Sequence, residues 1–187
     1  MTDAITVYSI PVILWAAVAY KLYPHVRWKR KPNASQRELV ITLACLGLGA
    51  VLLLPPAYRW LGGSTGIPNI ARLLANGLGL VACWTGQALF VRLIESEGRA
   101  RRIIRLYALA LLVLLALLAA FFVAASPSLT ESAIDFTQRF ADNPYILAYR
   151  VVVAIAGTAL FSALVEMVLT GWRTGRRLDA AGLAKSP

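Results

Sequence analysis

The stretch from Pro68 to Leu93, PNIARLLANGLGLVACWTGQALFVRL, decides the fold of this chain. Most of its side chains are apolar, and its length suits a helix that crosses the hydrocarbon core of a bilayer. Strongly polar side chains nonetheless interrupt it at Asn69, Arg72, Asn76, Gln87 and Arg92. Polar groups are costly in lipid, so these residues must face protein partners or serve a function.

The composition of the whole chain agrees with a membrane location. Of the 187 residues, 59% are hydrophobic and 15% are charged, and the mean hydropathy is +0.67. A soluble domain usually has about a quarter of its residues charged. The segment Leu106–Ala125 contains no Asp, Glu, Lys or Arg at all. Because such a segment is long enough to cross a bilayer, the sequence predicts an integral membrane protein.

Five apolar segments of this kind can be marked, and we expect each to be a helix because lipid cannot satisfy exposed backbone groups. A barrel is excluded because the segments do not alternate polar and apolar side chains. The prediction is therefore an all-α polytopic membrane protein with one helical domain over residues 1–187. The predicted spans are Ile5–Tyr23, Gln36–Leu54, Asn69–Leu93, Ile103–Ala125 and Tyr145–Trp172.

The basic residues predict the orientation of these spans. The net charge is +10, and most of the 19 Lys and Arg residues fall in residues 21–37, 92–105 and 173–185, which all lie on one side of the predicted membrane. Since positive residues stay cytoplasmic, the N-terminus is expected outside and the C-terminus inside the plasma (inner) membrane. The same charges would contact anionic lipid headgroups. No groove-reading motif accompanies them, so nucleic acid is not an expected partner.

Capping patterns predict where two of the helices begin. Ser35 and Glu38 match a capping box at the start of the second span, and Ser128 and Glu131 match another. The second box opens an amphipathic stretch, residues 129–142, which is too short to span. We expect it to lie flat on the outer membrane surface as a helix. The other outer connection, residues 55–68, is rich in Gly and Pro and is expected to be a flexible loop.

The polar residues of the opening stretch share one helical face. Asn69, Arg72, Asn76, Gly79, Cys83 and Gln87 recur at spacings of three and four. Ala75, Gly79 and Cys83 add a series of small residues that allows another helix to approach closely. Two interpretations remain for the polar side chains: hydrogen bonds to neighbouring helices, or a functional site. Arg72 could also extend to the outer headgroups.

The fifth predicted span carries the remaining charges within the membrane. Arg150 lies near the predicted depth of Arg72, so a site for a lipid or substrate anion is predicted at Asn69, Arg72, Asn76 and Arg150. The internal alternative is that Asp135 and Asp142 of the outer helix neutralise the arginines. At the inner end, Glu166 is expected to form a structural polar pair with Arg92.

Enzyme chemistry is not expected from this sequence. The chain has a single histidine and two cysteines, Cys45 and Cys83, each near the middle of a predicted span. No spacing typical of metal ligands and no Ser–His arrangement occurs, so neither a metal nor a cofactor is predicted.

Several motifs resemble an actinobacterial family of multi-pass membrane proteins that are regarded as transporters. The resemblance is carried by GIPNIARLLANGLGLVACWTGQ, the Arg-rich turn EGRARRIIR, FTQRFADNPYILAYRVV and the exit GWRTGRR. Pro68, Asn69, Ala71, Leu74 and Tyr149 carry it best. Family members are usually longer, with more spans and a following cytoplasmic domain. The resemblance implies transport of a solute.

The sequence allows three classes of function. The predicted function is a membrane protein of the transporter type that handles a small anionic or amphipathic solute, as a homo-oligomer because five short spans leave little room for a pathway. The alternative is an accessory, sensory or structural subunit of a larger membrane complex, which the small-residue faces favour. An enzyme acting in the membrane is the least favoured.

Overall fold

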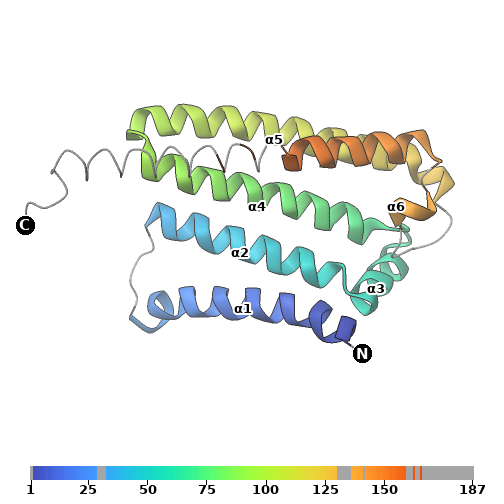
Figure 1. The fold of residues 1–187 in the computed structure, drawn as a ribbon, viewed down its shortest axis with the longest axis horizontal. Coiled ribbons are helices and arrows are strands. Elements are labelled where there is room, and N and C mark those ends of the chain that lie inside the picture. Colours follow the sequence, from blue (N-terminus) through green and yellow to red (C-terminus); the bar gives the residue numbers. More distant parts are fainter. Residues whose placement is uncertain are drawn as a thin grey trace, which may run out of the picture.

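A computed structural model describes residues 2–28, 33–129, 136–140, 142–158, 162 and 165, and all regular structure among them is helical. Four long helices lie side by side in a row (Figure 1): α1 (Thr2–Trp28), α2 (Ala34–Leu52), α4 (Ile70–Ile94) and α5 (Glu97–Ala125). The short α3 (Pro55–Thr65) crosses one end of the row, which we call the α3 end. The opposite end, where α2 begins and α4 ends, is called the Arg92 end.

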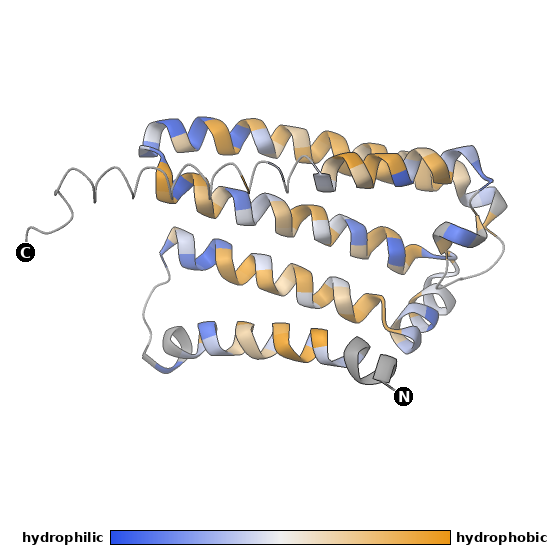
Figure 2. Cartoon of the chain, viewed as in Figure 1, coloured by the Kyte–Doolittle hydropathy of each residue, from blue (hydrophilic) through white to orange (hydrophobic). Residues whose placement is uncertain are grey.

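Three of these helices, α2, α4 and α5, are long and apolar enough to cross a membrane. Two shorter apolar helical segments, Tyr8–Tyr23 and Pro144–Thr158, correspond to the first and fifth predicted spans. The fifth was predicted to reach Trp172, but after residue 158 only residues 162 and 165 are described. Apolar residues dominate the middle of α4 and most of α5, whereas polar residues gather toward the helix ends (Figure 2).

Helix α2 begins two residues earlier than its predicted start, with a different cap. Asn33 is the N-cap, and its side-chain oxygen accepts a hydrogen bond from the backbone N–H of Gln36 at 2.7 Å. The Gln36 side chain accepts in return from the Asn33 backbone N–H at 3.2 Å. Asn33 and Gln36 satisfy each other's backbone N–H groups, as Ser and Glu do in the usual capping box. The predicted box of Ser35 and Glu38 is therefore wrong, and Glu38 is available for other contacts.

The predicted flexible loop over residues 55–68 is also wrong, because most of it is helix α3. Two prolines open the helix, where their fixed φ suits the first turn and their missing N–H costs nothing. Gly66 ends it with φ +67°, a left-handed conformation that glycine adopts without strain. Tyr58 lies on the face of α3 that contacts the start of α4, and it is buried.

The predicted amphipathic helix over residues 129–142 is described only in part. Leu129 follows a 3₁₀ turn, η1 (Ser126–Ser128), and is itself not helical. The described helical portion is α6 (Phe136–Arg139). Leu129 and Phe136, which belong to the apolar face of the predicted amphipathic helix, are buried in the core. Glu131 and Asp135 lie outside the described residues.

The main hydrophobic core lies at the α3 end, between α4, α5 and the segment Pro144–Thr158. Asn143 starts that last helix, because its side-chain oxygen accepts from the backbone N–H of Tyr145 at 2.9 Å. The core is built on Leu80, Leu118, Phe122, Ala125, Leu129, Phe136, Ile146, Tyr149 and Ala156.

Helices α2 and α4 approach each other closely through small residues. A Cβ built at Gly49 would lie 3.5 Å from the backbone oxygen of Ala75 and 3.8 Å from the Cβ of Leu78. Of the predicted small-residue series, Ala75 is thus at a helix contact. Gly79, by contrast, has no described atom within 4 Å of a built Cβ, and Cys83 is exposed.

We predict that Gly49→Leu destabilises the protein by about 1–3 kcal/mol, because the larger side chain must push α2 away from the α4 backbone. Gly49→Ala should be tolerated, since a methyl group meets only ordinary contact distances. Thermal unfolding in detergent, followed by circular dichroism, measures the effect. Gly79→Leu is the matched control, and equal midpoints for Gly49→Leu and Gly79→Leu would contradict the close contact.

Candidate functional site

The polar side chains of α4 meet their partners in two clusters, one at each end of the helix. The first, the α3-end cluster, comprises Tyr58, Asn69, Arg72, Asn76 and Tyr149. The second, the polar ladder, comprises Glu38, Thr42, Thr85 and Arg92 and joins α4 to α2.

Asn69 links α3 to the start of α4. The Tyr58 hydroxyl donates a hydrogen bond to Oδ1 of Asn69 at 2.8 Å, and both residues are 1% exposed. Asn69 has φ +62°, in the left-handed region that asparagine tolerates better than most residues. Its side chain makes no capping bond to the first turn of α4. Asn69 therefore acts as a tertiary link between two helices.

Asn76 links α4 to the segment Pro144–Thr158. Its side-chain amide donates to the Tyr149 hydroxyl oxygen at 2.7 Å. That hydroxyl donates in turn, at 3.4 Å, to the backbone carbonyl of Arg72. The Tyr149 ring packs edge-on against Phe136, with ring centroids 6.0 Å apart. Tyr149 thus joins the polar cluster to the aromatic core.

The structure brings three of the four predicted binding residues into one region. Asn69, Arg72 and Asn76 gather around Tyr58 and Tyr149, neither of which was predicted to belong to the site. Arg72 is half-buried, whereas Arg150, next to Tyr149, is exposed.

The predicted neutralisation of the arginines by the outer helix stays a prediction. Asp142 is exposed, and Asp135 lies outside the described residues. The signal that could have revealed the two tyrosines was their position: each lies in a connection or helix start on the same predicted side of the membrane as Asn69.

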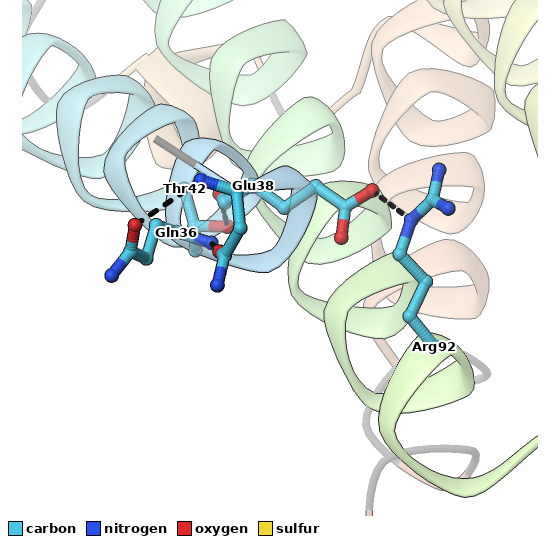
Figure 3. A network of polar contacts seen from close by, with 5 residues as sticks. Gln36, Glu38, Thr42 and Arg92 are labelled. Atoms are coloured by element: carbon cyan, nitrogen blue, oxygen red, sulfur yellow. Dashed lines mark hydrogen bonds and ion pairs between the residues drawn. The ribbon is translucent and has the colours of Figure 1, made fainter. Parts of the chain in front are cut away.

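At the other end of α4, Arg92 forms an ion pair with Glu38 of α2 (Figure 3). Its Nε donates to Oε1 of Glu38 at 2.6 Å, and the two side chains are 28% and 11% exposed, respectively. The other carboxylate oxygen of Glu38 is buried and has no hydrogen-bond partner among the described residues. The partner predicted for Arg92 was Glu166, which lies outside the described residues.

The polar ladder continues one turn further along α2. The hydroxyls of Thr42 and Thr85 are hydrogen-bonded at 2.7 Å, and the Thr42 hydroxyl also donates to the backbone carbonyl of Glu38 at 2.9 Å. Thr85 is buried at the α2–α4 contact. Glu38 therefore takes part in two contacts. Its side chain pairs with Arg92 of α4, and its backbone carbonyl accepts a hydrogen bond from Thr42 within α2.

Among the described residues, no group of three His, Cys, Asp or Glu side chains is placed to hold a metal ion. The clusters offer hydroxyls, amides and guanidinium groups, which bind anions and polar headgroups.

Comparisons with family models, curated proteins and solved structures found no match. The resemblance to the actinobacterial membrane family therefore stays a prediction.

We predict that Arg92→Ala destabilises the protein by about 1.5–3 kcal/mol, because it leaves the Glu38 carboxylate buried without its cation. Arg102→Ala, at an exposed position of α5, should change stability by less than about 0.5 kcal/mol. Thermal unfolding of both variants in detergent checks the difference.

The double variant Glu38→Ala with Arg92→Ala distinguishes the effect of the ion pair from the effect of side-chain packing between α2 and α4. It should recover part of the stability lost in Arg92→Ala, since neither charge is then left alone. Additive losses in the double variant would show that the ion pair contributes nothing to the α2–α4 contact.

Proposed function

We propose that this chain is an integral protein of the plasma (inner) membrane and moves a small anionic or amphipathic solute. Five helices cross the membrane, with the N-terminus outside and the C-terminus inside. Three long apolar helices, two shorter ones and the asymmetry of basic residues support this placement. In this orientation the α3 end is outside and the Arg92 end is inside.

One observation carries the transport proposal: polar groups lie at both ends of α4, although this helix is flanked by α2 and α5. The α3-end cluster offers Asn69, Asn76 and the guanidinium of Arg72. The Arg92 end offers the polar ladder. Polar and ionisable groups inside a membrane protein are typical of solute pathways. The guanidinium of Arg72 favours an anionic group on the solute, because the guanidinium fork matches carboxylate and phosphate.

The arrangement of the helices favours an oligomer. The long helices form a row in which α1 packs on α2, α2 on α4 and α4 on α5. The segment Pro144–Thr158 packs against α4 and α5, but a row of helices does not by itself enclose a solute pathway, which needs walls on all sides. A second copy of the chain would supply a further wall, and anionic lipids would contact the basic cytoplasmic surface.

The topology predicts which serines are accessible from outside the cell. Ser64 in α3 and Ser96 before α5 are both exposed. In a variant with Cys45→Ala and Cys83→Ala, Ser64→Cys should react with a membrane-impermeant maleimide on intact cells. Ser96→Cys should react only after the cells are opened. The reverse pattern would overturn the orientation.

Anion flux tests the function. Proteoliposomes containing the purified protein should show a current on a solid-supported membrane when octanoate is applied, and none without protein. Arg72→Gln should lower the current about tenfold, the ratio expected for about 1.4 kcal/mol. Arg59→Gln is the matched control, because Arg59 is exposed on α3 at the same end of the molecule.

The outcome also separates the two functional classes. A homo-oligomer in mild detergent together with an octanoate current supports transport. Equal currents for Arg72→Gln and Arg59→Gln would contradict a role for Arg72. The absence of any current, together with a stoichiometric foreign partner after purification, would identify an accessory subunit instead.

A further inference from the structure

The first turns of α5 carry four arginines, and two of them are neutralised by a glutamate four residues earlier in the chain. These ion pairs are Arg99 with Glu95, at 3.4 Å, and Arg101 with Glu97. Exposed pairs at this spacing contribute little to stability, but they cancel charge locally. These four residues therefore add no net charge to the start of α5.

The other two arginines, Arg102 and Arg105, are exposed and form no ion pair within the part of the chain that the structure describes. The residue four positions before Arg102 is Gly98, and the one before Arg105 is Arg101, so neither position offers a carboxylate. Residues three apart on a helix have their Cβ atoms about 5–6 Å apart, so both guanidiniums can reach the same anion. Two uncompensated positive charges thus remain on this face of α5.

An exposed apolar stripe continues from the arginine pair along the same side of α5. Its side chains are 59–65% exposed and recur at spacings of three and four, which keeps them on one side of a helix. The members of this stripe are Leu106, Leu109, Leu112 and Val113. Helix α5 lies at one edge of the row of long helices (Figure 1), and its buried residues, such as Leu118 and Phe122, pack into the core instead.

The charge pattern of α5 places the arginine pair at the membrane boundary. The uncharged segment Leu106–Ala125 is about 30 Å long at a rise of about 1.5 Å per residue, which matches the hydrocarbon core of a bilayer. Arg105 directly precedes this segment, and Arg102 lies about one turn earlier, where polar residues of α5 give way to apolar ones (Figure 2). The two guanidiniums are therefore at the level of the lipid phosphates, and the stripe is at the level of the acyl chains.

We propose that this face of α5 is a binding site for an anionic phospholipid of the cytoplasmic leaflet. Arg102 and Arg105 hold its phosphate, because the guanidinium fork matches a phosphate group, and the stripe lies along an acyl chain. The uncompensated charge favours a lipid with a net negative charge over a zwitterionic one. The inference rests on the proposed membrane placement, for which it names a lipid partner, and it does not depend on transport.

Fluorescence quenching tests the site on the full chain. In a variant with Cys45→Ala and Cys83→Ala, Leu109→Cys carries a bimane fluorophore in phosphatidylcholine nanodiscs. These contain an equal, small fraction of either phosphatidylglycerol or phosphatidylcholine with a nitroxide on one acyl chain. Phosphatidylglycerol should associate at this position at least about fivefold more strongly than phosphatidylcholine, a ratio that corresponds to about 1 kcal/mol. Ile13→Cys, at a position 65% exposed in the middle of α1, is the control, with an expected ratio near one.

Charge variants assign the preference to the arginine pair. Arg102→Gln with Arg105→Gln should bring the ratio measured at Leu109→Cys close to one. Lys21→Gln with Arg59→Gln is the matched control, because it removes the same two charges from exposed positions on other helices and should leave the ratio unchanged. Raising the salt concentration from about 0.05 M to about 0.5 M should also lower the ratio, because exposed charges are screened, and this measurement needs no charge variant.

Three results would overturn the lipid site. The first is equal ratios at Leu109→Cys and Ile13→Cys, and the second is a ratio that persists in the Arg102→Gln, Arg105→Gln variant and at high salt. The third is quenching at Ile13→Cys but not at Leu109→Cys, which would show that protein covers this face. Failure of the membrane placement would instead abolish quenching at both positions, and failure of transport would be seen only in the octanoate current.

Discussion

The contact between α2 and α4 is the constraint on which the rest of the structure depends. Gly49 lets α2 approach the α4 backbone at Ala75, and this distance places Thr42 against Thr85 and Glu38 against Arg92. In a low-dielectric environment an unpaired arginine would be strongly unfavourable, so α4 can carry Arg92 only because α2 supplies the carboxylate. The close packing and the ion pair thus both join α2 to α4.

The bounds of α4 could be predicted from the sequence, and its ion-pair partner could not. The helix runs from Ile70 to Ile94, against a predicted Asn69–Leu93, because a long apolar segment leaves little freedom in placing a span. The partner was missed because Glu38 also matched a capping box with Ser35. The two possible boxes lie two residues apart, and local sequence does not separate them. The structure has the box of Asn33 and Gln36, and Glu38 pairs with Arg92.

At the α3 end, too, local sequence did not reveal a tertiary contact. Residues 55–68 are rich in Gly and Pro, which favours a loop, yet two prolines are well suited to a first helical turn. What holds α3 in place is the bond from Tyr58 to Asn69, a contact that spacing alone does not reveal. Asn69, Arg72 and Asn76 could be grouped from their shared helical face, whereas the tyrosines that bind them come from other helices.

The two ends of the molecule are stabilised differently. At the α3 end, aromatic side chains around Tyr149 and Phe136 fill the space between helices. Toward the Arg92 end, small residues leave a cavity, and the polar ladder holds α2 against α4. The Thr42 hydroxyl bonds to the backbone carbonyl of Glu38, which belongs to α2 itself, so this bond does not depend on the ion pair of the Glu38 side chain. The two contacts of the polar ladder between α2 and α4 are therefore separate: Glu38 pairs with Arg92 by charge, and Thr42 bonds to Thr85 through their hydroxyls.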